Sequence, residues 1–189
     1  MTTEYNLIEI VQMDFPDLGE TLIAHELRKA ERDFASKTYI LSDTFADWLD
    51  GKDLNTLDKE YYGMRDIAFY DIDGNRRSSD YSVDSNNIFH IGNNDDSNIL
   101  SAAGHYYYLP SGDWGGNISY NQPSIPEQFR EALAYYVLKK AAVRSKDDRA
   151  RIYFSEYNAA VKDAKQYVNE EGKRTGLMFE MSMGMRNNK

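Results

Sequence analysis

The spacing of apolar residues near the start of the chain predicts an amphipathic helix over about residues 20–38. Within this range the apolar side chains recur every three or four positions, at Ile23, Leu27, Ala30 and Phe34. Such intervals place the side chains in one stripe along a helix. The other positions are mostly charged, and we interpret them as a face exposed to solvent or to another subunit. The residues before this helix are expected to be extended and turn-like.

The helical period disappears over about residues 39–122. Short β-prone runs alternate there with turn-forming clusters such as Asp73-Gly74-Asn75 and Gly92-Asn93-Asn94. This alternation predicts a small antiparallel sheet. Its candidate strands are residues 39–42, 66–72, 76–83, 87–91, 105–109 and 117–120.

A helical period returns near residue 125 and predicts two further helices. The first, over about residues 125–144, follows Ser124-Ile125-Pro126-Glu127, a sequence typical of a capped helix start with proline in the first turn. The second, over about residues 147–170, has an apolar stripe that begins at Tyr153 and Tyr157. Because their connection is short, the two helices are expected to form an antiparallel hairpin.

After Gly172 the pattern changes once more. Phe179, Met181 and Met183 alternate with polar or small residues at the period of a β-strand, in a segment that is rich in glycine. We therefore expect residues 172–189 to form a flexible, extended C-terminal tail.

Together these patterns predict an α+β fold with one domain, residues 1–171, followed by the tail. Its expected architecture is an antiparallel helical bundle, made of one N-terminal helix and a C-terminal helical hairpin, with an inserted small antiparallel β-sheet. A chain of 189 residues is long enough to bury a core without a metal or a disulfide. No run of eighteen apolar residues and no signal-peptide pattern is present, so we expect a soluble protein.

The charge of the chain is uneven. Its total is −9, but residues 1–125 carry 22 Asp and Glu against 9 Lys and Arg, which leaves −13. Residues 126–171 carry +1, and residues 172–189 carry +3. Because proteins bind DNA non-specifically through Lys and Arg, this balance argues against wrapping DNA and is compatible with repelling it.

The residues that usually carry chemistry are sparse or scattered. Cysteine is absent, and His25, His90 and His105 are too far apart in sequence to suggest a zinc site. The segment from Asp71 to Asn75 lacks the spacing of a calcium loop and favours a β-turn. Asp95-Asp96 has no flanking sequence that predicts burial. We expect no catalytic residue, no metal and no cofactor, and therefore no enzyme.

Tyrosine is abundant, with fifteen residues, several of them in clusters such as Tyr106-Tyr107-Tyr108. Tyrosine is enriched where proteins contact proteins, but half-buried residues of a small domain explain the clusters equally well. One interpretation is a small, non-enzymatic domain that binds a peptide or polysaccharide through a tyrosine-rich sheet.

Two segments in this order resemble the head-tail connector adaptors of tailed bacteriophages. Ala30-Glu31-Arg32-Asp33-Phe34-Ala35-Ser36-Lys37-Thr38 is similar to the helix ending of that family, often Ala-x-Arg-Glu-Phe-Cys-x-x-Thr. The segment from Ile118 to Tyr136 is similar to its second signature, a strand leading into a capped helix, and the helix with Arg149-Ala150-Arg151 is similar to the partner helix. Asp33 and Ala35 depart from the usual Glu and Cys, which indicates a distant, podovirus-like member.

The resemblance implies a structural virion protein, made in the host bacterial cytoplasm and located at the neck between capsid portal and tail. Such proteins form a homo-oligomeric ring, commonly of twelve copies, that binds the portal ring above and a tail or nozzle protein below. It implies no catalysis and no membrane, and DNA passes through the channel without specific binding. A tail-completion or tail-tube protein is the nearby alternative.

The resemblance also implies where contacts form. The helical core would join subunits, the β-rich insertion would face neighbours or tail proteins, and the C-terminal tail would reach the portal. The ring-interface candidates are Arg28, Arg32, Tyr135, Arg144, Arg151 and Tyr157. The portal-contact candidates are Leu177, Met178, Phe179, Met181, Met183 and Met185. We further hypothesise that part of the acidic residues 1–125 lines the channel, and that the tail becomes ordered on the portal.

Overall fold

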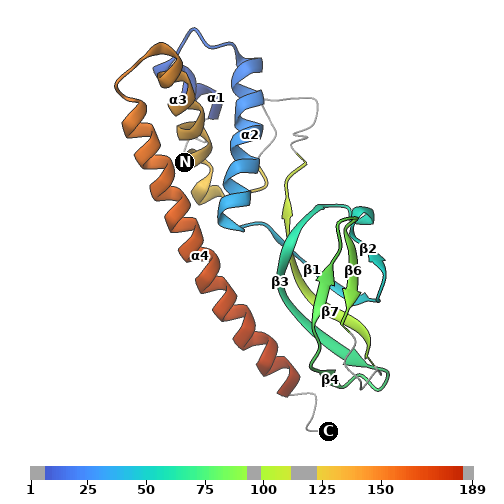
Figure 1. The fold of residues 1–189 in the computed structure, drawn as a ribbon. Coiled ribbons are helices and arrows are strands. Elements are labelled where there is room, and N and C mark those ends of the chain that lie inside the picture. The colour runs from blue at the N-terminus through green and yellow to red at the C-terminus, as the bar shows by residue number, and fades with distance from the viewer. Residues whose placement is uncertain (1–6, 93–98, 112–122, 185–189) are drawn as a thin grey trace. The chain divides into compact units, whose positions relative to one another are not determined.

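The computed structural model describes residues 7–92, 99–111 and 123–184, and for residues 173–184 it describes the backbone alone. The chain forms two compact units (Figure 1). The helical unit consists of Met1–Ile40 together with Gly112–Lys189, and the sheet unit consists of Leu41–Ser111. The predicted strand at residues 117–120 and the pair Asp95-Asp96 lie outside the described residues.

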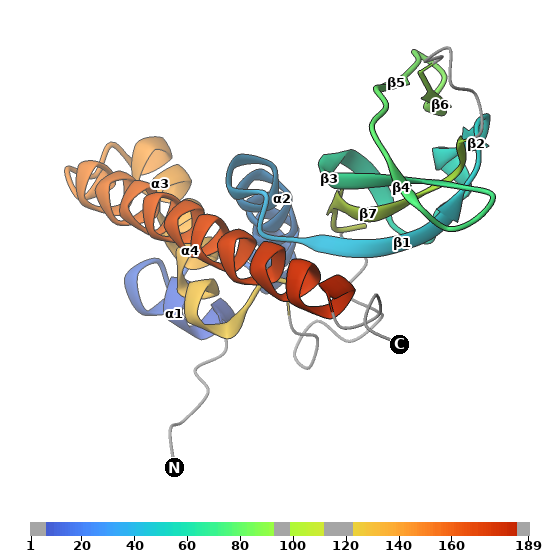
Figure 2. The same ribbon diagram turned by 90° about the horizontal axis from the view of Figure 1, so that it is seen from below.

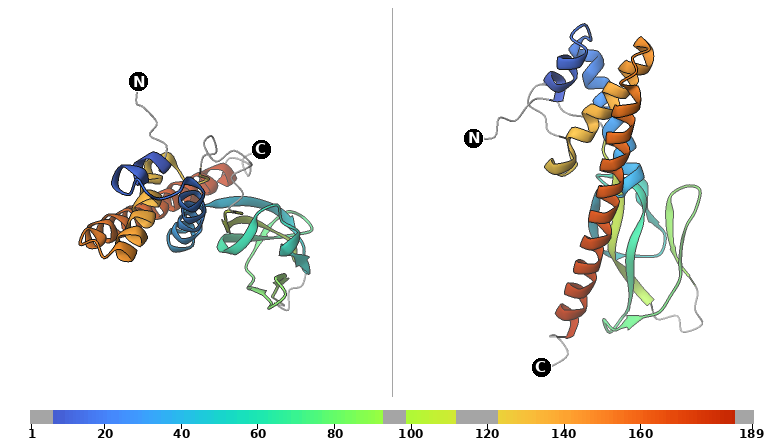
Figure 3. Two further views of the ribbon diagram at one scale, coloured as in Figure 1. Left: turned by 90° about the horizontal axis from the view of Figure 1, so that it is seen from above. Right: turned by 90° about the vertical axis from the view of Figure 1, so that its left-hand side faces the viewer.

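The described residues of the helical unit form four α-helices and a short 3-10 helix. They are α1 (Leu7–Asp14), α2 (Glu20–Thr38), η2 (Glu127–Phe129), α3 (Glu131–Ser145) and α4 (Ala150–Gly184). The hairpin of α3 and α4 is antiparallel, as the short connection predicts, and α2 packs on both helices (Figure 3). With 35 residues, α4 is much longer than α3, and its second half extends beyond α2 and α3.

The core of the helical unit contains the apolar stripe that the sequence predicts. Ile23, Leu27, Ala30 and Phe34 of α2 are all fully buried. The ring of Phe34 meets the ring of Tyr157 from α4 edge to face, with 6.1 Å between the centroids. This stripe confirms the helix over residues 20–38, because burying one apolar face is the main source of stability for such a helix.

Helix α1 corrects the expectation that the first residues are extended. Its eight residues include several β-branched side chains, which hide a short helical pattern. Ile8 and Val11, one turn apart, are buried. The end of α1 is held by Asp14, whose two carboxylate oxygens lie 2.6 Å from Nη1 of Arg149 and 2.9 Å from the hydroxyl of Tyr153. Tertiary packing therefore stabilises a helix too short to form alone.

The expectation of an extended C-terminal tail is also wrong, because the backbone of α4 is helical as far as Gly184. The alternation of apolar residues after Gly176 suggests a strand, but the Leu, Met and Glu residues of this segment are good helix formers. Leu177 with Met181, and Phe179 with Met183, are also one helical turn apart. The same residues thus satisfy both periods, and the helix that precedes them continues.

The sheet unit contains two antiparallel sheets. The elements are β1 (Ser42–Trp48), β2 (Lys52–Asp53), η1 (Leu54–Thr56), β3 (Glu60–Asp71), β4 (Arg76–Arg77), β5 (Tyr81–Val83), β6 (Ile88–Ile91) and β7 (Ile99–Leu109). The strand order is β1-β7-β3-β4 in the four-stranded sheet and β2-β6-β5 in the three-stranded sheet. The long strands β3 and β7 curl along their length (Figure 2).

The prediction of a helical bundle with a small inserted sheet is therefore wrong. The fold is α+β, with four helices, a curled four-stranded sheet and a second three-stranded sheet, and β3 and β7 are twelve and eleven residues long. The sequence pattern gives only a weak strand signal for β7 and β1, because β7 contains the small residues Ser101 to Gly104 and β1 contains Asp43 and Asp47. Residues of these types are depleted in strands, and cross-strand pairing overrides their local preference.

An aromatic core holds the two sheets together. Phe45 and Trp48 of β1 stack with 4.0 Å between their ring centroids, and Trp48 meets Phe89 of β6 edge to face at 5.6 Å. All three side chains are buried. Gly104 of β7 lies where β3 approaches closely, since a Cβ atom there would lie 2.2 Å from the carbonyl oxygen of Asp66. The sheet unit thus has a core of its own and a backbone contact that requires glycine.

Candidate functional site

The two segments that resemble phage adaptors lie against each other in the helical unit. The rings of Phe34, near the end of α2, and Phe129, in η2, have their centroids 6.0 Å apart. The backbone N–H of Ser124 donates a hydrogen bond to the carboxylate of Glu31, which is fully buried. Ser124 therefore contacts α2 through its backbone, and the expected side-chain cap at this helix start is not formed, since Pro126 is the cap residue of η2.

A second contact of the α2 segment runs to α4. The hydroxyl of Tyr157 donates to Oδ2 of Asp33 at 2.5 Å, and Nζ of Lys37 lies 2.7 Å from the same oxygen. Burial, followed by the neighbouring Asp33 carboxylate, raises the pKa of Tyr157 well above its usual range. Asp33 stands where the adaptor family usually has Glu, and its carboxylate fastens α4 to α2.

Further along α2, Glu26 joins this helix to α3. Its carboxylate oxygens lie 2.8 Å from Nζ of Lys140 and 3.2 Å from Nζ of Lys29, and its side chain is only 7% exposed. The hydrogen bond from Lys140 is the main reason why the pKa of Glu26 lies below its usual value, with a smaller contribution from Lys29. Nζ of Lys140 also lies 4.5 Å from the ring centroid of Tyr136. We call Glu26, Glu31 and Asp33 the α2 acidic seam.

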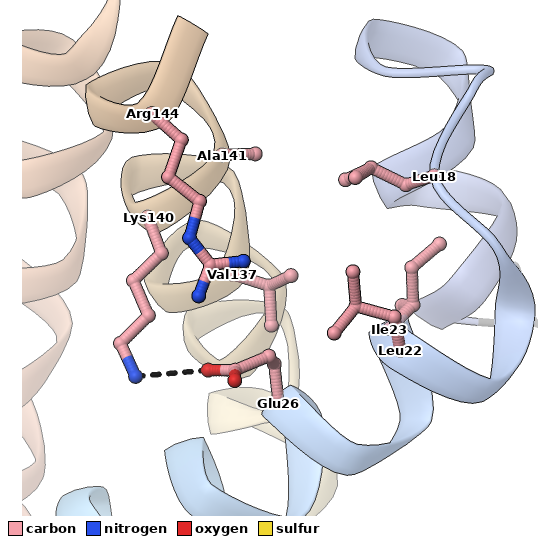
Figure 4. A pocket seen from close by; sticks show the side chains of 8 residues that line it. All are labelled: Leu18, Leu22, Ile23, Glu26, Val137, Lys140, Ala141 and Arg144. Atoms are coloured by element: carbon pink, nitrogen blue, oxygen red, sulfur yellow. Dashed lines mark hydrogen bonds and ion pairs between the residues drawn. The ribbon is translucent and has the colours of Figure 1, made fainter.

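A groove lies beside this seam, between α3 and the chain around the start of α2 (Figure 4). Its lining residues are Leu18, Leu22, Ile23, Glu26, Val137, Lys140, Ala141 and Arg144. The empty space is about 260 Å³ and includes open solvent, so it is smaller than the roughly 300–1,000 Å³ of small-molecule sites. Leu22 is 41% exposed in it. The guanidinium of Arg144 extends along the groove and makes no hydrogen bond or ion pair to any described residue.

The other ring-interface candidates are spread over the helical unit. Arg28 and Arg32 lie one turn apart on α2; Nε of Arg28 is buried without a hydrogen-bond partner among the described residues, whereas Arg32 has a partner. Arg151 is exposed in the first turn of α4. The hydroxyl of Tyr135 donates to Glu131 at 3.0 Å, and burial together with Glu131 raises the pKa of Tyr135 to about 12.

Tyr157 is the candidate that does not fit a subunit interface, because it is 1% exposed and packs inside the helical unit. The remaining candidates do not form one cluster. Tyr135 lies in the second turn of α3 and Arg144 in its last turn. The five portal-contact candidates from Leu177 to Met183 lie on the helical backbone at the end of α4, and Met185 lies outside the described residues.

The sequence assigns Glu26, Glu31 and Asp33 to a charged face exposed to solvent or to another subunit, so their contacts within the helical unit were not identified. A signal was present. Glu26 lies three positions after Ile23, and Glu31 lies three positions before Phe34, so both flank the apolar stripe at helical spacing. A carboxylate at such a position is drawn into the contact with the next helix and needs a partner there.

The tyrosines of the sheet unit divide between its core and its surface. Tyr106 is buried, and its ring stacks on that of Tyr61 with 6.3 Å between the centroids. Tyr62 and Tyr81 are each 41% exposed. The tyrosine clusters therefore contribute both to the core and to the surface of the sheet unit.

The His and Asp side chains of the sheet unit that could carry chemistry make contacts within that unit. Nδ1 of His105 lies 2.8 Å from Oδ1 of Asp66, a pairing between β7 and β3. The backbone N–H of Gly74 donates to the carbonyl oxygen of Asp71 at 3.0 Å, which confirms the predicted β-turn, and the Asp71 carboxylate accepts further hydrogen bonds from the backbone N–H of Asp73 and of Asn75. Across residues 7–92, 99–111 and 123–172, no three His, Asp or Glu side chains are placed to hold a metal ion.

In the part of the chain that the structure describes, no helix is both long and apolar enough to cross a membrane.

No sequence profile of a known protein family matches the chain, and no curated protein matches it with significant similarity.

Proposed function

We propose that this protein is a structural subunit of a homo-oligomeric ring at the neck of a tailed bacteriophage. The ring, commonly of twelve copies in such phages, joins the portal to a tail or nozzle protein and surrounds part of the DNA channel. The observation that carries the proposal is the packing of the two adaptor-like segments against each other. Glu31 and Ser124 are 93 positions apart in sequence, yet they are hydrogen-bonded beside the contact between Phe34 and Phe129. The likeness thus concerns one packed part of the fold.

The polar groups of that part support a structural role. Glu26, Glu31 and Asp33 each bind a group on another segment of the helical unit, which is Lys140, the Ser124 backbone or Tyr157. Glu26 and Glu31 are buried and Asp33 is partly exposed, and carboxylates that are paired in this way fix how helices pack. A rigid helical unit is what a subunit needs in order to meet identical neighbours at one fixed angle.

The distribution of charge supports the proposed channel. Within Leu41–Ser111 there are thirteen Asp and Glu against five Lys and Arg, which leaves −8 of the total of −9. A ring that turns part of this acidic surface toward its channel repels the DNA backbone, so that DNA passes without binding. Coordinates of the ring with the acidic residues wholly on its outer wall would remove this part of the proposal.

The end of α4 is the proposed portal contact. Leu177, Met178, Phe179, Met181 and Met183 bring apolar and adaptable side-chain types to the last turns of this helix. A helical segment with such residues binds by lying in an apolar groove of its partner. Docking through a helix replaces the strand addition that an extended tail would use.

Removing the end of α4 tests the proposal. A chain that ends at Gly176 lacks the contact residues, whereas a chain that ends at Met185 keeps all six and loses only four residues. Both should fold, because both keep residues 150–172 of α4, where Tyr153, Tyr157 and Ala164 are buried against the rest of the helical unit. We expect the full chain and the longer variant to bind purified rings of the portal protein encoded in the same phage genome, and the shorter variant to lose that binding. Equal binding by both truncated chains would refute the portal contact, and no binding by the full chain would refute the proposed function.

A further inference from the structure

The groove between α3 and the start of α2 offers apolar walls and one cation, Arg144, that makes no hydrogen bond or ion pair to a described residue. Leu18, Leu22 and Val137 provide apolar walls, and the guanidinium of Arg144 extends over them (Figure 4). The neighbouring Glu26 is already neutralised by Lys140 and Lys29. An occupant that fits this groove therefore brings an apolar side chain together with an acidic group that has no partner of its own.

The sheet unit carries such a pair at the turn between β3 and β4. Ile72 is 75% exposed, more than any other large hydrophobic side chain of the described residues. Asp73 follows it, is exposed, and its carboxylate makes no hydrogen bond or ion pair to a described residue. The turn is rigid, because the carboxylate of Asp71 accepts two backbone hydrogen bonds within it and lies 2.6 Å from Arg77. Ile72 and Asp73 are thus presented together on a fixed tip.

We infer that the β3–β4 turn of one copy docks in the α3 groove of a second copy, with Ile72 on the apolar walls and Asp73 paired with Arg144. Each copy offers its turn to one neighbour and its groove to another, and the contact used in this head-to-tail way is heterologous. Heterologous contacts produce rings when the rotation between copies closes. The inference deepens the proposed ring by naming the contact that closes it, and it rests on that proposed function only for the number of copies.

The absence of cysteine allows a direct test by disulfide cross-linking of the full chain. The variant with Leu22→Cys and Ile72→Cys places one thiol in the groove and one on the turn. The matched control combines Leu22→Cys with Leu49→Cys, since Leu49 is also exposed, at 54%, but lies in the turn after β1. Oxidation of the first variant should produce a ladder of covalent oligomers, alone or on the portal ring, and the control should not.

The charge pair is tested in the same background. Adding Arg144→Glu should reduce the ladder about fivefold, as expected for the loss of a partly exposed ion pair and its replacement by repulsion. Adding Asp73→Arg to that chain should restore the ladder, because the two charges are then exchanged. A reduction without restoration would show that Arg144 does not pair with Asp73.

Three results would overturn the inference. They are a ladder no stronger than that of the control, a disulfide closed within single chains, and a ladder that is indifferent to Arg144→Glu. These results differ from a failure of the proposed function, because binding of the cysteine-free chain to the portal ring is measured separately. A chain that binds the portal but gives no ladder refutes only the groove contact.

Discussion

The helical unit and the sheet unit differ in how many acidic residues they carry in excess and in how many of them are buried. In the helical unit, acidic and basic residues nearly balance, and Glu26 and Glu31 of α2 are buried where helices meet. In the sheet unit the balance is −8, and Asp71 is the one acidic side chain among the described residues of that unit that is buried. The core of the sheet unit is instead aromatic, with Trp48 at its centre.

This difference indicates which charges are needed for folding. Removing a carboxylate from the α2 acidic seam leaves the partner group on another segment without its hydrogen bond. Removing an exposed carboxylate from the sheet unit changes the electrostatic field around the protein and has little effect on packing. The helical unit thus has two acids buried in its packing, whereas the described acids of the sheet unit other than Asp71 lie at its surface and add to the field around the protein.

The largest expected effect separates the two cores. Phe34→Ala removes a fully buried ring from the helical unit, and Trp48→Ala removes a buried ring from the sheet unit. Each should lower the free energy of unfolding by about 3–5 kcal/mol. Hydrogen exchange should show faster exchange in the α-helices for Phe34→Ala and in the β-strands for Trp48→Ala. If either variant loosened both units equally, the units would not have independent cores.

A smaller effect, confined to the sheet unit, is expected at Gly104. The Cβ atom of Gly104→Ala would meet the carbonyl oxygen of Asp66 at 2.2 Å, so β3 and β7 must separate. Overpacking of this kind costs about 1–3 kcal/mol. Gly63→Ala is the matched control, because a Cβ atom at Gly63 meets nothing within 4 Å. Chemical denaturation of the two variants compares them, and equal stabilities would contradict the close approach of β3 and β7.

Glu26→Gln should destabilise the helical unit by about 1–2 kcal/mol, since Lys140 and Lys29 lose a charged partner but keep access to water. The same contact makes stability depend on pH. Because the pKa of Glu26 is lowered in the folded state, its contribution is complete above the usual carboxyl pKa and is lost as the pH falls through the lowered value.

Denaturation curves between neutral and acidic pH measure this contribution. The free-energy difference between the natural chain and Glu26→Gln should be largest at neutral pH and should shrink in acid. Asp58→Asn, at an exposed position of the sheet unit, is the control and should change stability by less than about 0.5 kcal/mol. A constant difference at every pH would show that the Glu26 charge does not hold α2 to α3.

Salt should have the smallest effect, and it should act on the sheet unit. Raising NaCl from about 0.01 M to about 1 M shortens the screening length from about 30 Å to about 3 Å. Repulsion within the sheet unit is then screened, so its free energy of opening should rise by roughly 1 kcal/mol or less. Hydrogen exchange at the two salt concentrations measures the free energy of opening of both units in one sample. A larger rise in the free energy of opening for the helices than for the strands would contradict the proposed contrast between the two units.

The sequence predicts those parts of the fold in which one local pattern dominates. The stripe from Ile23 to Phe34 has a single helical period, and the structure has α2 at the residues expected for it. In β7, the small residues before Tyr106 weaken the strand pattern, and pairing with β3 decides the outcome. The end of α4 satisfies a strand period and a helix period at once, so its conformation depends on the helix that leads into it.

The candidate site was less predictable than the helices that form it. Arg144 was named from the resemblance, but its position over a groove depends on how α3 packs beside the start of α2. Glu26 is buried only because Lys140, 114 positions away in sequence, lies opposite to it. The role of Ile72 follows from exposure on a turn, which no periodic pattern reveals.

Native mass spectrometry of the intact chain mixed with the purified portal ring tests the central claim most directly. The claim predicts a complex in which one portal ring carries one complete ring of this protein, with a copy number that matches the symmetry of the portal, and no partly filled series at saturation. A portal ring that gains no mass, or gains only scattered single copies, would contradict the proposal that this chain is a ring subunit of the phage neck.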